Sequence, residues 1–227
     1  ADVRNQLGRL ALSMVELTNR QHQAGLDLNG DKGQPFFGPI SLDTRFNITP
    51  STPAILKMEV DPSDPEAPTR FQASDYAVRY TDTNKIEIRR VSDGKFFNPD
   101  PDPAKYGFTS TTPIEVDLTS GPVDFDGLRL TQTTSGNPGD QILLSPFATV
   151  ASQVKVALTA PAQLAIASPV LVQADPDNGD GLQVEALYRP YNTVTAPAWA
   201  NTVVTFGANG QYSLETSDGT TTTTSGP

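Results

Sequence analysis

One short stretch near the start of the chain has the side chains and the spacing of a calcium-binding loop. Asp27, Asn29 and Asp31 alternate there, and calcium prefers carboxylate and amide oxygens. Counted from Asp27, however, the sixth position is Lys32, where an EF-hand loop turns on glycine, and the twelfth is Gly38, where a bidentate glutamate is needed. The pattern therefore predicts a tight polar turn, with calcium binding by Asp27, Asn29 and Asp31 as the less favoured alternative.

A second acidic loop, "DPDNGDG" at 175–181, has a related pattern. Asp175 and Asp177 are spaced as calcium ligands, but the fifth position is Gly179 and the twelfth is Ala186. A solvated turn is again the favoured interpretation, and a metal site is the alternative.

Catalytic patterns are no better formed. His22 is the single histidine, and it stands in a helical segment with no nucleophile near it in sequence, so we expect it to be exposed or at an interface. The carboxylate pairs Asp124/Asp126 and Asp100/Asp102 could act as acid and base, but both stand in turn-like contexts. The sequence contains no G-x-S-x-G elbow, H-E-x-x-H pair or glycine-rich phosphate loop. These observations predict a protein that is not an enzyme and has no cofactor.

Composition narrows the class of partner. The 227 residues carry a net charge of −10, with a pI near 4.4, and Lys and Arg cluster nowhere, which argues against nucleic acid and anionic membranes. Cysteine is absent, and the longest apolar run is far shorter than the roughly 20 residues of a membrane span. The chain starts without Met, already in helical register, and shows no signal peptide. We interpret it as a fragment whose targeting signal lies elsewhere.

The first 24 residues predict a helix with a narrow apolar stripe. Its members follow heptad spacing, which is typical of a helix-packing seam: Val3, Leu7, Leu10, Met14 and Leu17. Three heptads are short for a coiled coil alone, so the partner helix would come from elsewhere in the parent protein or from a neighbouring subunit. The alternative is an amphipathic helix that packs on the chain's own domain. Gly25 is a natural stop.

After Phe37 the apolar period changes to two, which predicts a mainly antiparallel β domain and an α+β fragment overall. The clearest hairpin pairs 76–80 with 86–88. Segment 135–140, "SGNPGD", reads as a hairpin connection, and 160–168 as a short helical turn. Loops rich in proline interrupt any ladder at 61–69 and 98–106. The other expected strands are 55–60, 114–118, 125–132, 141–147 and 154–159, followed by 170–174, 181–188, 202–206 and 211–216 of a second β module.

Several motifs in order resemble the flagellar hook-associated protein 1 family, the hook–filament junction proteins. The stretch "NRQHQAGLDLNGDKGQPFF" is similar to a family pattern N-x-x-H-x-x-G-x-D-L-N-G-x-x-G-x-x-F-F, and "SDYAVRY", "DFDGLRL" and "GDQILLSP" resemble later family strands. Ile142 replaces the usual aromatic residue, and Ala160-Pro161 replaces the usual Asp-Pro. The resemblance covers about residues 1–169.

The resemblance implies a structural role in a ring between hook and filament. It implies four parts: a rod-helix end at 1–24, a linker turn at 25–37, a β-rich outer domain at 38–168 and the start of an inserted β module at 169–227. Gly25, Phe36 and Phe37 would anchor the boundary between helix and β domain. The implied partners are further copies of the subunit, the hook protein, the next junction protein and an export chaperone that binds outside this fragment. The implied location is the extracellular flagellum, reached through the flagellar type III system without a cleaved signal peptide.

One alternative from another class stays open. The late aromatic residues Tyr188, Tyr191 and Trp199 could form contacts of an extracellular β-module that binds carbohydrate or an adhesin ligand.

Overall fold

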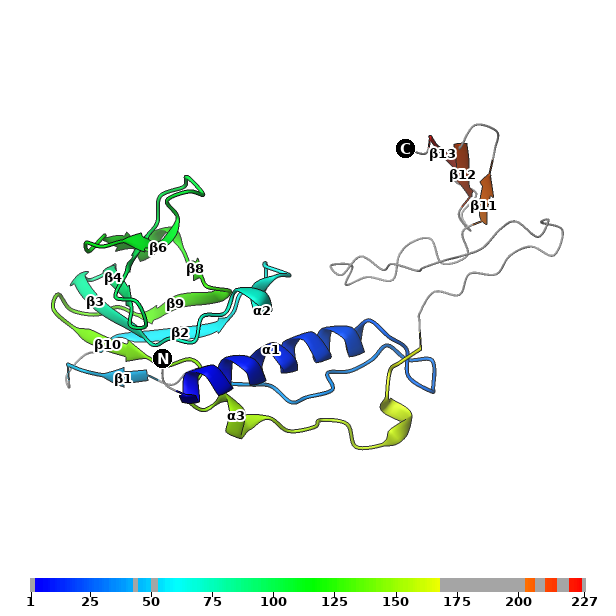
Figure 1. The fold of residues 1–227 in the computed structure, drawn as a ribbon, viewed down its shortest axis with the longest axis horizontal. Coiled ribbons are helices and arrows are strands. Elements are labelled where there is room, and N and C mark those ends of the chain that lie inside the picture. Colours follow the sequence, from blue (N-terminus) through cyan, green and yellow to red (C-terminus); the bar gives the residue numbers. More distant parts are fainter. Residues whose placement is uncertain are drawn as a thin grey trace. The chain divides into compact units, whose positions relative to one another are not determined.

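The computed structural model describes residues 3–42, 45–49, 53–167, 203–206, 211–215 and 221–225. The chain divides into two compact units, Ala1–Asp180 and Gly181–Pro227. In the first unit one long helix precedes a series of antiparallel strands (Figure 1). The predicted α+β class, mainly β with an N-terminal helix, is confirmed.

Helix α1 spans Val3–Gln23. Its sequence holds no proline and a single glycine, Gly8, so nothing interrupts the backbone ladder. The helix ends where predicted: the N–H groups of Ala24 and Gly25 bond to the carbonyls of Arg20 and His22, at 3.1 Å each. None of the helices in the described ranges combines the length and apolar character that a membrane crossing requires.

The larger sheet of the first unit has seven strands in the order β1-β10-β3-β4-β5-β6, and β7 also pairs with β4. The predicted hairpin is formed by β3 and β4, which lie in the middle of this strand order. Val78 lies opposite Ile88, and Tyr80 lies opposite Ile86. All four side chains are buried, and along β3 buried residues alternate with half-buried or exposed ones, as expected for a sheet with one face in the core. The strands are β1 (Arg45–Asn47), β3 (Tyr76–Asp82), β4 (Lys85–Arg90), β5 (Phe96–Asn98), β6 (Gly107–Ser110), β7 (Val116–Asp117) and β10 (Gln141–Leu144).

A smaller sheet has the order β2-β9-β8, formed by β2 (Ile55–Val60), β8 (Val123–Phe125) and β9 (Leu128–Thr134). Side chains from the two sheets meet in one core. The ring of Tyr76 lies 5.0 Å from that of Phe125, and the Tyr80 hydroxyl donates to Gln132 at 3.0 Å. The buried aromatic side chains therefore join the two sheets.

Two short helical turns connect these strands, α2 (Ala67–Arg70) and η1 (Leu118–Ser120), and two more follow β10, namely α3 (Val150–Gln153) and η2 (Pro161–Gln163). Two of the connections lie against α1. The Ser13 hydroxyl donates to the carbonyl of Pro68 in α2, at 2.9 Å. Gly8 lies against the backbone of Phe147, just before α3. Helix α1 is thus packed on its own β domain.

Two predicted features of the strand pattern are wrong. Segment 125–132 is not one strand, because Asp126 and Gly127 form the turn between β8 and β9 with φ values of +49° and +75°. That pair is typical of a two-residue hairpin turn, and Asp-Gly is the usual sequence for it. Segment 135–140 is not a hairpin connection either, because β9 pairs with β2 and β8 whereas β10 pairs with β1 and β3. The loop crosses from one sheet to the other.

Other bounds also differ from expectation. Segment 154–159 is extended but pairs only through a single bridge from Val156 to Phe37, since its neighbour is a linker and not a sheet edge. Two short strands, β5 and β6, flank the proline-rich loop at 98–106 and were not predicted. Strand β2 and the helical turn η2 fall where the sequence predicted them.

The second unit contains β11 (Val203–Phe206), β12 (Gln211–Glu215) and β13 (Thr221–Ser225), paired antiparallel in that order. The first two coincide with predicted strands, whereas no strand was predicted at the third. The predicted strands at 170–174 and 181–188 and the acidic loop at 175–181 lie outside the described residues, as do Tyr188, Tyr191 and Trp199.

Candidate functional site: the corner at the end of helix α1

The stretch with calcium-like spacing is a hydrogen-bonded turn built on Asp27. One carboxylate oxygen accepts the N–H groups of Asn29 and Asp31 at 2.8 and 2.9 Å, and the Asp27 carbonyl accepts the N–H of Gly30 at 3.1 Å. Desolvation acts to raise the pKa of Asp27, but these donors together outweigh it and lower the pKa. Asp27 thus caps its own turn. Among the described residues, no group of three or more acidic, histidine or cysteine side chains is placed to hold a metal ion.

His22 lies on the buried side of α1 and joins three segments of the chain. Its Nε2 accepts the backbone N–H of Ala165 at 2.9 Å, which places the ring proton on Nδ1, where it is donated to the carbonyl of Gln34. The ring meets Phe36 edge-on, with 5.6 Å between centroids. The expectation of an exposed or interface histidine is wrong, since His22 is 5% exposed. Its partners are 12 and 143 residues away in sequence, so no local pattern points to them.

Asn19 fixes the linker against the helix. Its Oδ1 accepts the N–H of Phe37 at 2.7 Å, and its Nδ2 donates to the carbonyl of Phe37 at 3.1 Å. A single side chain therefore satisfies both backbone groups of one linker residue, as a neighbouring strand would. The rings of Phe36 and Phe37 pack edge-on 4.8 Å apart. The two phenylalanines thus lie along the last turns of α1.

Two glycines of the stretch 25–33 allow close backbone contacts near the end of α1. A Cβ at Gly33 would lie 2.0 Å from the His22 carbonyl oxygen, and one at Gly25 would lie 2.5 Å from the Ala165 carbonyl oxygen. No side chain fits at either place. Gly25 and Gly33 therefore stand where the backbones of α1, the linker and the segment around Ala165 come into contact.

The third segment of the corner is the return from α3 through η2. It runs antiparallel to the linker: the Gly38 N–H donates to Lys155 at 2.9 Å, and Leu26 forms a bridge with Ala167. In Figure 1 this yellow-green segment and the blue linker follow α1 on its way from the β domain. We call the assembly of α1 with segments 25–41 and 153–167 the corner. These three segments line a groove of about 440 Å³; Asn19, Phe37 and Leu158 are among the lining residues.

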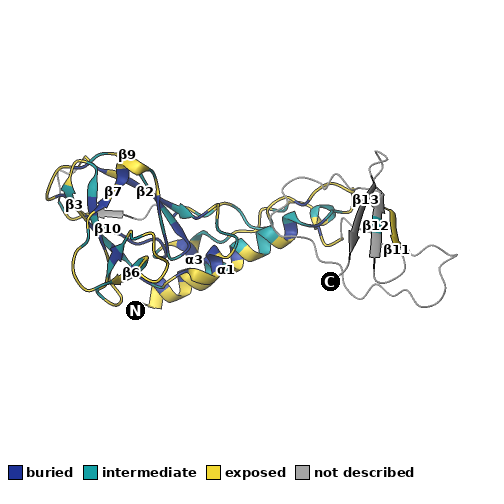
Figure 2. Cartoon of the chain, turned by 90° about the horizontal axis from the view of Figure 1, so that it is seen from above, coloured by how far each residue is buried: buried dark blue, intermediate teal, exposed yellow. Residues whose placement is uncertain are grey.

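The opposite face of α1 is uncovered in the described structure. All five members of the predicted seam, which we call the stripe, are between 47% and 74% exposed: Val3, Leu7, Leu10, Met14 and Leu17. Exposed residues follow the helix in Figure 2, beside its buried positions. Helix α1 packs on the chain's own domain through its buried face and not through the stripe. That the stripe packs against another helix stays a prediction.

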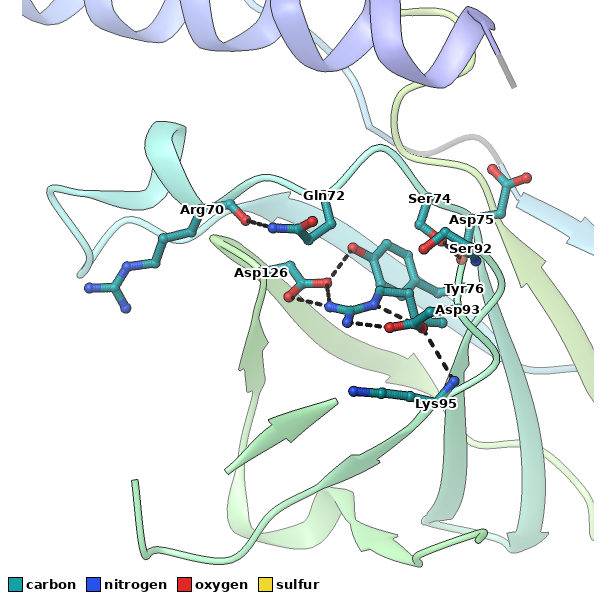
Figure 3. A network of polar contacts seen from close by, with 10 residues as sticks. Arg70, Gln72, Ser74, Asp75, Tyr76, Ser92, Asp93, Lys95 and Asp126 are labelled. Atoms are coloured by element: carbon teal, nitrogen blue, oxygen red, sulfur yellow. Dashed lines mark hydrogen bonds and ion pairs between the residues drawn. The ribbon is translucent and has the colours of Figure 1, made fainter. Parts of the chain in front are cut away.

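A second polar cluster lies inside the β domain, around Arg90. Its Nη1 donates to both oxygens of Asp126 at 3.0 Å, and its Nη2 donates to Asp93 at 2.6 Å. Figure 3 shows the Tyr76 hydroxyl directed at Asp126, to which it donates at 2.9 Å. The Arg90 guanidinium also lies 4.7 Å from the centre of the Phe108 ring. The cluster ties the turn between β8 and β9 to the centre of the larger sheet.

The electrostatics of this cluster are those of a structural ion pair. Burial raises the pKa of the Asp126 carboxyl, although Arg90 and the Tyr76 hydroxyl oppose that change. Burial, together with the charge of Asp126, raises the pKa of the Tyr76 hydroxyl well above its ordinary value. Asp124 and Asp126, one of the two pairs considered as acid and base, have separate partners. Asp124 accepts hydrogen bonds from Nε and Nη2 of Arg129, at 2.7 and 2.9 Å, whereas Asp126 accepts from Arg90. The structure therefore assigns each of these carboxylates a partner within the fold.

Taken together, these features define an α+β protein in which a long helix is locked to a β domain on one face and carries an apolar stripe on the other. Residues 1–37 match the family model of the flagellar hook-associated protein FlgK helical domain. The chain is also similar to relatives named flagellar hook-associated protein 1, including one from Salmonella typhimurium and one from Escherichia coli. The one from Salmonella typhimurium is 30% identical over 179 residues, which is 78% of this chain and 28% of the relative. The one from Escherichia coli is 29% identical over 228 residues, 96% of this chain and 36% of the relative.

A solved structure agrees with these relatives at the level of the fold. The flagellar hook junction protein FlgK from Burkholderia pseudomallei matches with a TM-score of 0.57 and 21% identity, over 73% of this chain and 26% of that one. The resemblance to the flagellar hook-associated protein 1 family is thereby confirmed. The chain spans between a quarter and about a third of the length of the relatives that it matches.

Proposed function

We propose that this chain is a segment of a structural subunit of the bacterial flagellum, in the junction ring between hook and filament. The observation that carries the proposal is the exposed stripe on α1, inside the part of the chain that matches a flagellar helical domain. Burial of apolar surface is favourable by roughly 25 cal/mol per Å². Apolar side chains at heptad spacing are typically buried against another helix. The stripe is therefore the seam through which this segment joins the rest of the rod domain or a neighbouring subunit.

The corner gives this role a geometric basis. Residues 1–24 form the end of the rod helix, 25–37 the linker turn, 38–168 the outer β domain and 169–227 the start of an inserted module. Hydrogen bonds from Asn19 and His22 hold the linker and the return segment against α1. Gly25, Phe36 and Phe37 are the anchor of this boundary. The corner thus sets the direction in which the β domain leaves the helix.

The remaining parts of the proposal follow from the same role. The subunit acts by packing, without catalysis or a cofactor, and its partners are other copies of itself, the hook protein and the next junction protein. An export chaperone binds outside this segment. The subunit is exported through the flagellar type III system, without a cleaved signal peptide, and works outside the cell. The net charge of −10 supports a role away from nucleic acid and anionic membranes.

The carbohydrate-binding alternative has less support. The aromatic residues on which it rested, Tyr188, Tyr191 and Trp199, lie outside the described residues, and the relatives above are named for the flagellum.

The test uses the full-length parent protein in a strain that lacks its hook–filament junction protein. The double variant Leu10→Gln with Leu17→Gln replaces two exposed stripe side chains by a good helix former. The control is Arg9→Gln, an exposed position about 100° around the helix from Leu10. We expect the wild type and the control to restore swimming and filament attachment, and the double variant to release filaments. A wild type that fails to restore attachment contradicts the junction role, and a double variant that restores it fully contradicts the seam.

A further inference from the structure

We propose that Asn29 is a site of spontaneous deamidation and that the turn built on Asp27 controls its rate. Asn29 is exposed, and the residue after it is Gly30, so the backbone nitrogen that would attack the amide carries no side chain beside it. Apart from Gly30 itself and its two neighbours in the chain, no residue has an atom within 4 Å of the place where a Cβ of Gly30 would stand. The Asn29 side chain and the space beside Gly30 are therefore open to water.

The reaction balances with water as the one added reactant. The backbone nitrogen of Gly30 loses its proton and attacks the side-chain carbonyl carbon of Asn29, forming an N–C bond. The bond from that carbon to Nδ2 breaks, and the amide nitrogen leaves as ammonia with the transferred proton. Water then opens the resulting succinimide at either carbonyl, which gives aspartate or isoaspartate.

In the folded corner both reacting groups are engaged. The Gly30 N–H donates to the carbonyl of Asp27 at 3.1 Å, and the Asn29 amide donates to the second carboxylate oxygen of Asp27 at 3.3 Å. The first carboxylate oxygen holds the N–H groups on either side of Gly30, those of Asn29 and Asp31. Attack on the amide therefore requires the turn to open. Asp27 is the residue that keeps it closed.

The product would change the corner in which it forms. An aspartate at position 29 adds a negative charge between Asp27 and Asp31, and like charges at this distance repel. An isoaspartate also lengthens the backbone by one carbon. The adjacent contacts are the Leu28 N–H to Ala162 bond at 3.1 Å and the bridge from Leu26 to Lys32. Deamidation would therefore loosen the hold of the linker on the return segment.

The test follows the whole chain in phosphate buffer at neutral to mildly basic pH and 37 °C, with peptide mapping by mass spectrometry. The readout is the gain of one mass unit and the isoaspartate fraction in the peptide that contains Asn29. Asp27→Ala removes the carboxylate that closes the turn, and we expect the rate at Asn29 to rise about fivefold, the population change produced by the loss of roughly one net hydrogen bond. Asp27→Asn keeps one acceptor oxygen for the same N–H groups, so its rate should stay within about twofold of wild type.

Two further measurements complete the test. Wild type in concentrated urea should deamidate at Asn29 at least as fast as Asp27→Ala in buffer, because both lack the closed turn. Asn178 and Asn209, each also followed by glycine, report in the same digest whether a substitution changes rates generally. Equal rates at Asn29 in wild type and Asp27→Ala would overturn the control by Asp27. Absence of product at Asn29 in Asp27→Ala would overturn the site itself.

Discussion

The two faces of α1 contain different kinds of residue and meet different surroundings. The stripe holds five large apolar side chains at heptad spacing, and they are exposed. The opposite face is a mixture of apolar, small and polar residues, and it is the face that the chain itself buries: Asn5, Gly8, Leu12, Val15 and His22. The more regular apolar pattern thus lies on the uncovered face. Periodicity found the helix, but the buried face was set by complementary shape and hydrogen bonding with the β domain.

The contrast has a physical reason. A helix that packs on a second helix needs a repeated row of side chains, because the surface it meets repeats every turn. The buried face of α1 instead meets three unlike partners: α2, the backbone near Phe147, and the linker. Each contact has its own solution, which is a hydroxyl at Ser13, an absent side chain at Gly8 and an amide at Asn19. Such a face has no repeated row of apolar side chains to detect, although its buried positions keep helical spacing.

The largest expected effect comes from a matched pair of leucines on the two faces. Leu12→Ala should lower the free energy of unfolding of the chain by about 3 kcal/mol, since this side chain is fully buried in the core. Leu10→Ala should change it by less than about 0.5 kcal/mol, because Leu10 is 66% exposed. Urea denaturation of both variants measures the difference. Equal losses would show that the stripe is already covered within this chain.

A smaller effect is expected at Gly8, with a sign opposite to the intrinsic preference. Alanine is normally favoured over glycine within a helix by about 1 kcal/mol. A Cβ at Gly8, however, would lie 2.0 Å from the carbonyl oxygen of Phe147, so Gly8→Ala must separate α1 from the domain. We expect a net loss of about 2 kcal/mol in the free energy of unfolding, measured in urea. A stabilised variant would mean that α1 can move away from Phe147 without cost.

At the corner, Asn19→Ala should cost about 1.5 kcal/mol, since it leaves both backbone groups of Phe37 without this partner. The loss should be local. Amide hydrogen exchange should speed up at Phe37 and in the linker, while β3 and β4 keep their protection. Unchanged exchange at Phe37 would show that the reciprocal bond does not hold the linker.

The smallest effect is a pH dependence at Asp27. Its pKa is lowered in the folded chain, so its contribution to stability is present above the pKa of the unfolded chain and is lost as pH falls through the lower, folded value. The difference in unfolding free energy between wild type and Asp27→Asn should therefore shrink below about pH 4. Urea titrations at several pH values between 3 and 7 measure it. A difference that grows on acidification would contradict the hydrogen-bonded turn.

Local rules carried much of the prediction. Strand β2 and the β3–β4 hairpin follow from alternation, and the end of α1 at Gly25 follows from helix-stop preferences. The "DFDG" stretch held its own correct signal as well, since Asp-Gly predicts a tight hairpin turn. The apolar residues on both sides also fit one continuous strand, and that alternation hides the turn at Asp126 and Gly127.

What failed were relations between distant segments. The crossing at 135–140 could not be inferred, because a polar loop looks the same whether it joins paired strands or two sheets. The role of His22 was hidden because its ring nitrogens bond to Gln34 and Ala165. Asp126, which accepts hydrogen bonds from both Arg90 and Tyr76, is likewise 36 and 50 residues away from them in sequence.

By itself, the sequence determined that this segment contains a long helix, an acidic turn at Asp27 and a series of antiparallel strands, since each of these depends on neighbouring residues. The tertiary structure alone decided which face of α1 is buried, what His22 bonds to and why glycine stands at positions 25 and 33. The physical reason is that close backbone contacts and buried hydrogen bonds depend on which segments lie next to one another in space. Those neighbours are set by the whole fold and not by the local sequence.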